Sequence, residues 1–284
     1  MVYETNPEPP RILARLGQYL KPVRHSLVRN AAPLALALAA TAPAVAQEDV
    51  RVYAAASLAT AVTALADAYA DAGLGEVTLV TGSSGALANQ IAQGAPADVY
   101  LSANREWVDF LVENRAVAAE AVISFAGNRL VVIVPPGAER DTGDGGAEAL
   151  AAALDGLRIA VGDPAVAPVG AYARQALTTL GLWQALEPNL VPAQDTSAAL
   201  AYVTRDAVDA GIVYATDAAL TDVHVVATLP EDSHDPIRYY AAPVAGGDPA
   251  AAAAFLDMLI GDAGAEVLGG LGFSPGAGDG DLTQ

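Results

Sequence analysis

The stretch VRVYAAASLATAVTALADAYADAGLGEVTLVTGSSGALANQI, residues 50–91, predicts how the chain folds. A short β-type run at 50–56 ends in small residues and passes into a segment whose apolar residues recur at helical spacing. Glycines close that helix, residues 76–81 predict the next strand, and Gly-Ser-Ser-Gly at 82–85 predicts a tight turn into a second helix. Strands that alternate with helices in this way indicate α/β units around mainly parallel sheets.

The same alternation continues along the chain. A strand at 97–101, a helix at 106–117 and a strand at 130–134 are followed by a Gly-, Asp- and Glu-rich segment, 137–147, that predicts a surface loop. Beyond it we expect strands at 157–161, 211–214, 224–228 and 238–244, and helices at 169–180, 195–203 and 250–260. Two such runs, 50–127 and 129–228, predict two similar lobes, and the Gly-rich tail after Phe273 is expected to be flexible.

Residues 1–46 differ from the rest and are expected to form a secretory signal peptide. Five basic residues lie among the first 30, an apolar run follows at 31–42, and Ala44-Val45-Ala46 is a small-x-small cleavage site before Gln47. The apolar run is too short to span a bilayer, so an N-terminal membrane anchor is the weaker alternative. The chain has no cysteine, which excludes disulfides and a lipid-anchored N-terminal cysteine. We therefore expect a soluble, periplasmic protein.

The exported part is strongly acidic. Five of the 14 lysine and arginine residues and two of the 33 acidic residues precede residue 47. The rest of the chain therefore has nine arginines and 31 carboxylates. Such a charge disfavours nucleic acid or an anionic membrane surface as a partner and is typical of a protein kept soluble in salty surroundings. Hydrophobic residues make up 53% of the chain, which is ample for a packed core, and we expect a monomer.

Several turns place small or hydroxyl-bearing residues between a predicted strand and a predicted helix. They are Ala54-Ala55-Ala56-Ser57, Gly82-Ser83-Ser84-Gly85, Asp195-Thr196-Ser197 and the purely backbone turn Ala167-Pro168-Val169-Gly170. Helix N-termini present unpaired N–H groups and partial positive charge, so several together form an anion site without any cationic side chain. Each turn alone is more often a plain helix cap, but their recurrence in both halves favours an anion-binding cleft.

Five stretches of the chain form a specific pattern when they are taken together. They are VYAAASL at 52–58, GAPADVYLSAN at 94–104, RIAVGDP at 158–164, AGIVYATDA at 210–218 and TLPEDSH at 228–234. In this order and spacing they resemble the periplasmic molybdate-binding proteins of ABC transporters. The resemblance implies a two-lobed binding-protein fold of type II, with two mixed, mainly parallel sheets flanked by helices. It also implies a solute-binding protein rather than an enzyme, which needs no cofactor and delivers its ligand to an ABC transporter permease.

The resemblance further implies a domain layout and a set of ligand contacts. Lobe one would combine 47–127 with 238–284, and lobe two would span 128–237. The contacts carried over are two serine hydroxyls, two backbone amides and a tyrosine: Ser57, Ser84, Val169, Thr196 and Tyr214. Gly85 stands where the family has a serine, and Thr196 stands where an aliphatic residue is common. The extra Thr196 hydroxyl either points at the ligand or caps its helix.

These contacts suit a tetrahedral dianion such as molybdate or tungstate, which carries only acceptors and needs only donors. About seven hydrogen bonds to a charged group, each contributing roughly 1.5–3 kcal/mol before ordering costs, exceed the about 8 kcal/mol that micromolar binding requires. Neither an arginine nor a direct cation ligand is needed. Molybdate and tungstate nearly match in size and charge, so the sequence does not separate them.

Other functions fit the sequence less well. The turn at 82–85 is not the G-x-S-x-G elbow of serine hydrolases, neither His224 nor His234 lies in such a turn, and no G-x-x-x-x-G-K-[ST] phosphate loop is present. A cation could use Glu231, Asp232, His234 and Asp235, although this cluster is more typical of a solvated hinge loop. Phosphate, which keeps a proton at neutral pH, would need an acceptor such as Asp195 or Asp163. Sulfate is smaller and would fit a molybdate-sized shell loosely.

Overall fold

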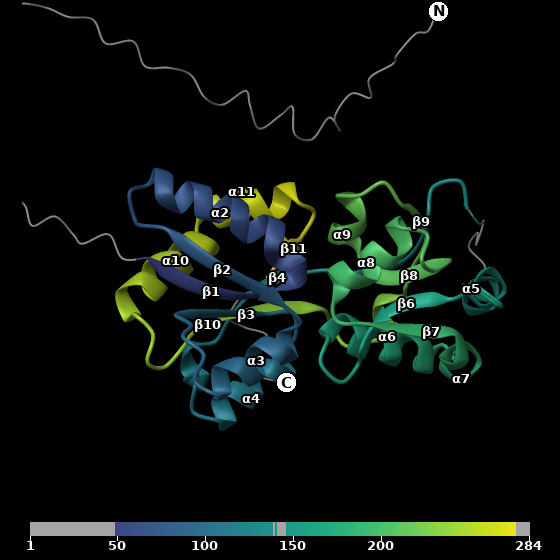
Figure 1. Ribbon diagram of the computed structural model, residues 1–284, viewed down its shortest axis with the longest axis horizontal. Helices are drawn as coiled ribbons and strands as arrows, with labels where there is room; N and C mark the ends of the chain where they lie inside the picture. The colour runs from purple at the N-terminus through teal and green to yellow at the C-terminus, as the bar shows by residue number, and fades with distance from the viewer. Residues whose placement is uncertain (1–48, 139, 141–145, 277–284) are drawn as a thin grey trace, which may run out of the picture. The chain divides into compact units, whose positions relative to one another are not determined.

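The computed structural model describes residues 49–138, 140 and 146–276. The predicted signal peptide, 1–46, and residues 277–284 of the predicted flexible tail lie outside the described residues. Strands and helices alternate around two mixed sheets (Figure 1), so the predicted α/β class is confirmed. Among the described helices, none is long and apolar enough to cross a membrane.

The first sheet mixes parallel and antiparallel strands. β1 (Val50–Ala55) pairs in parallel with β2 (Val77–Gly82) and β3 (Val99–Ser102). β10 (Arg238–Pro243) runs antiparallel to β3 and to β4 (Ile123–Gly127), and β11 (Ser274–Pro275) completes the order β11-β4-β10-β3-β1-β2. The accompanying helices are α2 (Ala59–Asp71), α3 (Ser84–Ala92), α4 (Arg105–Glu113), α10 (Pro249–Ile260) and α11 (Asp262–Gly270).

The second sheet is built from the middle of the chain. β6 (Ile159–Gly162) pairs in parallel with β7 (Leu190–Ala193) and β8 (Ala210–Tyr214), while β5 (Leu130–Val134) runs antiparallel to β8 and to β9 (His224–Thr228). The strand order is β7-β6-β8-β5-β9. Its helices are α5 (Gly146–Leu154), α6 (Pro168–Thr179), α7 (Trp183–Leu186), α8 (Thr196–Thr204) and α9 (Ala215–Ala219).

The chain passes between the two sheets twice. It leaves the first sheet after β4 and enters the second at β5, through Asn128 and Arg129, and it returns between β9 and β10 through 229–237. The two passages lie side by side, because the Asn128 N–H donates a hydrogen bond to the carbonyl of Ile237 at 3.3 Å. One buried apolar cluster runs from the first sheet into the second, with Val52 and Ile159 among its members.

Some predicted boundaries are wrong for local reasons. The helix predicted at 106–117 ends as α4 at Glu113. Arg115 then takes a left-handed conformation with φ of 58°, at a position where no glycine indicates the end of a helix. Helix α5 was not predicted, because its alanine-rich sequence shows no clear apolar stripe against the acidic loop before it. Strands β4 and β7 were also missed, since both are short and only partly buried.

Candidate functional site

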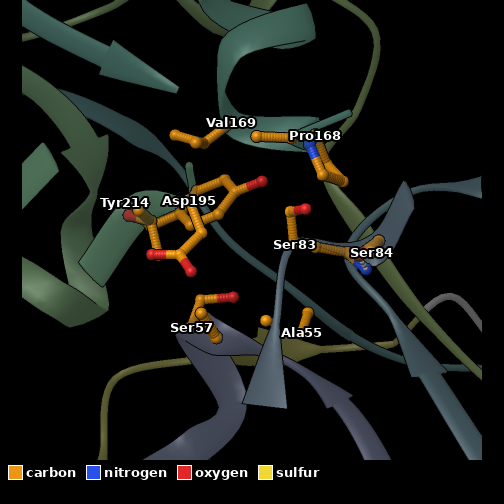
Figure 2. Close-up of a pocket in the computed structure, with 13 residues that line it drawn as sticks. Ala55, Ser57, Ser83, Ser84, Pro168, Val169, Asp195 and Tyr214 are labelled. Atoms are coloured by element: carbon orange, nitrogen blue, oxygen red, sulfur yellow. Dashed lines mark hydrogen bonds between the residues drawn. The ribbon is translucent and has the colours of Figure 1, made fainter. Parts of the chain in front are cut away.

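A small pocket is lined by strand ends and helix starts from both sheets (Figure 2). All five residues predicted to contact the ligand line it. The full lining is Ala55, Ala56, Ser57, Gly82, Ser83, Ser84, Ala103, Ala167, Pro168, Val169, Asp195, Thr196 and Tyr214. Among the described residues that form this lining there is no lysine or arginine, so only hydroxyls and backbone groups can attract an anion.

Ser57 lies in a short 3-10 turn, Ala56–Leu58, between β1 and α2. A serine in such a turn is more often a plain helix cap, but Ser57 is not one, because neither the turn nor α2 has a side-chain cap bond. The Ser57 Oγ instead accepts a hydrogen bond from the Tyr239 hydroxyl at 3.0 Å. Because the oxygen already accepts, the Ser57 proton remains to be donated toward the pocket.

Two consecutive serines open helix α3. Ser83 is its N-cap, with the Oγ accepting from the Ala86 N–H at 3.4 Å, and it lines the pocket beside Ser84 (Figure 2). Ser84 is fully buried, and its Oγ accepts from the Ala103 N–H at 3.1 Å. Each hydroxyl therefore keeps a proton to donate. Ser83 was not predicted as a contact; its neighbour in the same turn was carried over from the family pattern alone.

The turn from β6 into α6 is held tightly against its own strand. Pro168 opens the helix, where its missing N–H is no loss, and Val169 offers one of the first helical N–H groups to the pocket. The next residue, Gly170, packs so closely that an added Cβ would lie 1.9 Å from the Gly162 carbonyl oxygen. Just before the helix, the Val166 carbonyl accepts from the Gly85 N–H at 3.0 Å, which ties the two sides of the pocket together.

Thr196 opens helix α8 behind its N-cap, Asp195, whose Oδ1 accepts from the Ala198 N–H at 2.9 Å. The sequence left open whether the Thr196 hydroxyl points at a ligand or caps the helix, and the structure shows neither. The hydroxyl donates to Asp217 Oδ2 at 2.8 Å, and both residues are buried. The Thr196 side chain is thus directed to a carboxylate behind the pocket, which leaves its backbone N–H as the group available to an anion.

Tyr214 ends strand β8 with only 1% of its surface exposed. Its hydroxyl is one of three buried side-chain atoms in the described part of the chain that have no hydrogen-bond partner. Burial raises the pKa of Tyr214 well above its usual value, so the hydroxyl stays protonated. An unpartnered buried donor destabilises a fold by about 1–3 kcal/mol, and this one lines the pocket, where an acceptor would satisfy it.

The other candidate sites fare differently. Across the described residues, no three His, Asp or Glu side chains are grouped as metal ligands would be. In the 231–235 segment the His234 Nδ1 lies 2.7 Å from the carbonyl of Asp235. His224 begins the edge strand β9 and is exposed. Asp163 does not line the pocket, and its Oδ1 accepts from the Ala165 N–H at 2.9 Å.

The buried Asp217 predicts a pH-dependent stability. Burial raises its pKa from 3.8 to about 7, although hydrogen bonds from Thr196 and the Tyr214 backbone oppose the rise. Between about pH 4 and pH 7 the folded state therefore holds a proton that the unfolded state has lost, and the free energy of unfolding falls as the pH rises. Above about pH 7 both states are ionised and this contribution no longer changes.

We expect Asp217→Asn to remove that dependence. Urea unfolding should show that the free energy of unfolding of the parent protein falls by about 2 kcal/mol or more between about pH 5 and about pH 8. The Asp217→Asn variant should not show this fall. Asp222→Asn, at an exposed position on the same segment, is the matched control. Parallel pH profiles for the parent protein and Asp217→Asn would contradict the prediction.

Comparison with known proteins agrees with this geometry. The family model described as bacterial extracellular solute-binding protein matches residues 50–274. The molybdate-binding protein ModA of Escherichia coli is 40% identical over 243 residues, covering 84% of this chain and 95% of that protein. ModA of Haemophilus influenzae is 39% identical over 231 residues, covering 81% and 91%.

A solved structure extends the likeness to three dimensions. The periplasmic molybdate-binding protein of Azotobacter vinelandii matches with a TM-score of 0.70 and 25% identity, over 79% of this chain and 98% of that one. The predicted family and the predicted two-lobed binding-protein fold are thereby confirmed. The chain belongs to the family of bacterial extracellular solute-binding proteins and is a homologue of the molybdate-binding protein ModA.

Proposed function

We propose that this chain captures molybdate or tungstate in the pocket and delivers it to the permease of an ABC transporter. One observation carries the proposal: hydroxyl and N–H donors from both sheets converge on a single pocket whose described lining has no cationic side chain. A fully deprotonated tetrahedral dianion offers acceptors only, so this donor set is complementary to it. The relatives that bear the name molybdate-binding protein support the choice among such dianions.

In this proposal five groups contact the ligand. They are the hydroxyls of Ser57, Ser84 and Tyr214 and the backbone N–H groups of Val169 and Thr196. Ser83 is a sixth candidate, because it carries a hydroxyl and lines the same pocket. Fixed donors at helix starts gain from the helix dipole as well as from hydrogen bonding, which explains how an acidic chain could hold an anion without an arginine.

We further propose how capture and release work. The segments 47–127 and 238–284 would form one lobe and 128–237 the other, and the lobes would close about the two passages at Asn128–Arg129 and 229–237. Closure would bring the serines of the first lobe and the amides and tyrosine of the second onto one ligand. The protein would act as a soluble monomer in the periplasm, without a cofactor.

A second ligand class is favoured by one contact. Asp195 lines the pocket, and its helix-capping bond uses Oδ1, which leaves Oδ2 as an acceptor. An oxyanion that keeps a proton near neutral pH, such as phosphate or arsenate, could donate that proton to Asp195. Molybdate and tungstate have no proton to donate, and the Asp195 carboxylate would repel them. Titration with both kinds of anion therefore distinguishes protonated oxyanions from fully deprotonated dianions.

Calorimetric titration of the ligand-free protein, residues 47–284, with molybdate, tungstate, sulfate and phosphate tests the proposal. We expect one-to-one binding of molybdate and tungstate with a dissociation constant of about 1 μM or tighter. Sulfate should bind about a hundredfold more weakly or worse, because its smaller size lengthens every hydrogen bond. Binding heat with phosphate and none with molybdate would mean that the pocket binds protonated oxyanions, and it would overturn the proposal.

A further inference from the structure

A chain of three hydrogen bonds runs from the passages between the sheets to the pocket. The Asn128 Nδ2 donates to the Tyr239 hydroxyl at 3.1 Å and to the Thr216 Oγ1 at 2.8 Å. The Tyr239 hydroxyl in turn donates to the Ser57 Oγ at 3.0 Å. We propose that Tyr239, oriented by Asn128, is a positioning residue that fixes the Ser57 hydroxyl as a donor to the bound anion. This inference rests on the proposed function.

The direction of the chain follows from the chemistry of its members. An amide nitrogen is only a donor, so the Tyr239 oxygen must accept the hydrogen bond from Asn128. The single hydroxyl proton of Tyr239 is then donated to Ser57. The Asn128 Oδ1 accepts from the Arg129 N–H at 2.9 Å, which agrees with the amide orientation. Ser57 thus receives a hydrogen bond, and its own proton is left for the pocket. Donors in such a series polarise one another, which strengthens the last bond.

Packing holds Tyr239 so that it cannot turn away from Ser57. Its side chain is fully buried, and its ring contacts three aromatic rings, those of Phe125 at 6.2 Å, Tyr214 at 6.0 Å and Phe273 at 5.3 Å between centroids. Burial also raises the pKa of Tyr239 above its usual value, so its proton is retained. One of the three rings belongs to Tyr214, so the same residue supports two of the proposed ligand donors.

The location of these residues links the hinge to the site. Asn128 lies in the first passage between the sheets, Tyr239 is the second residue of β10 just after the return passage, and Thr216 lies in α9 beside the second sheet. A movement of either passage therefore changes what the Ser57 hydroxyl faces. In the structure all three bonds are made at once, so Ser57 is set as a donor while both passages keep these positions.

A double-mutant cycle on the full exported chain tests this role, with molybdate as the probe. Tyr239→Phe, which removes only the hydroxyl, should weaken binding about tenfold in calorimetric titration. In a Ser57→Ala background the same substitution should change the affinity less than about twofold, because its effect passes through the missing hydroxyl. Asn128→Ala should weaken binding as well, and its effect should not add to that of Tyr239→Phe.

The matched control is Tyr240→Phe, the next residue of β10, whose side chain packs in a different apolar cluster with Tyr100. It should leave the affinity unchanged. Tyr239→Phe with unaltered affinity, or with an equal loss in both the parent and Ser57→Ala backgrounds, would overturn the positioning role. If the parent protein itself fails to bind molybdate or tungstate, the proposed function fails instead, and unfolding curves for each variant separate either result from a general loss of folding.

Discussion

Replacing Ser57 and Ser84 together by alanine should weaken molybdate binding at least tenfold. Each hydroxyl keeps a proton to donate to the anion, because each oxygen already accepts a hydrogen bond, from Tyr239 and from the Ala103 N–H. A hydrogen bond to a charged group contributes about 1.5–3 kcal/mol, and about 1.4 kcal/mol corresponds to a tenfold change in affinity. Titration of the double variant with molybdate measures the loss directly.

The control for this experiment is Ser124→Ala. Ser124 also carries a buried hydroxyl, it has no hydrogen-bond partner, and it does not line the pocket, so its removal should leave the affinity unchanged. Ser84→Ala also strips the acceptor from the Ala103 N–H, and urea unfolding must therefore accompany each titration. Full affinity in a folded double variant would show that the Ser57 and Ser84 hydroxyls are not the ligand donors. Ser83, which lines the same pocket, would then be the next serine to test.

Gly170→Ala should destabilise the protein and abolish tight binding. The new Cβ would lie 1.9 Å from the Gly162 carbonyl oxygen, 2.5 Å from its carbon and 2.9 Å from the Pro164 nitrogen. All three are backbone atoms, so no side chain can rotate to make room. Helix α6 would have to move off β6, at a cost of about 3 kcal/mol or more, and the Val169 N–H would move with it.

Chemical denaturation and titration of the same sample check both effects. Gly269→Ala in helix α11 is the control, because an added Cβ there meets nothing within 4 Å. That variant should be as stable as the parent protein or more so by up to about 1 kcal/mol, since alanine is the better helix former. A Gly170→Ala protein with normal stability would mean that α6 is not held against β6 as described.

The local pattern predicted much of the fold because its signals lie close together in sequence. The alternation of small-residue strand ends and helix starts at 50–91 is a short-range feature, and β1, α2, β2 and α3 appear nearly where they were expected. The end of α4 was misplaced because the chain leaves the helix through Arg115 in a left-handed conformation, which is uncommon for a residue other than glycine and which the sequence does not signal. Helix α5 was missed because a run of alanines carries little periodicity.

The candidate site was predictable in its members but not in its bonds. Ser57, Ser84, Val169, Thr196 and Tyr214 line one pocket, as the family pattern led us to expect, and their role as ligand contacts stays a prediction. The partner of Ser57 lies 182 positions away at Tyr239, and no spacing rule connects residues so far apart. Thr196 looked like a cap or a ligand contact, yet its hydroxyl faces Asp217, on a different helix.

The split origin of the pocket lining has a mechanical consequence. Hydroxyls come from the β1 and β2 side, whereas the amides of α6 and α8 and the Tyr214 hydroxyl come from the other sheet. If the sheets part, each keeps only its own share of the donors, and affinity falls exponentially with the bonds that are lost. A transporter that moves the two sides apart could thus release the proposed anion without a proton, a counter-ion or a covalent step. The two sets of donors would then be free to close around the next anion.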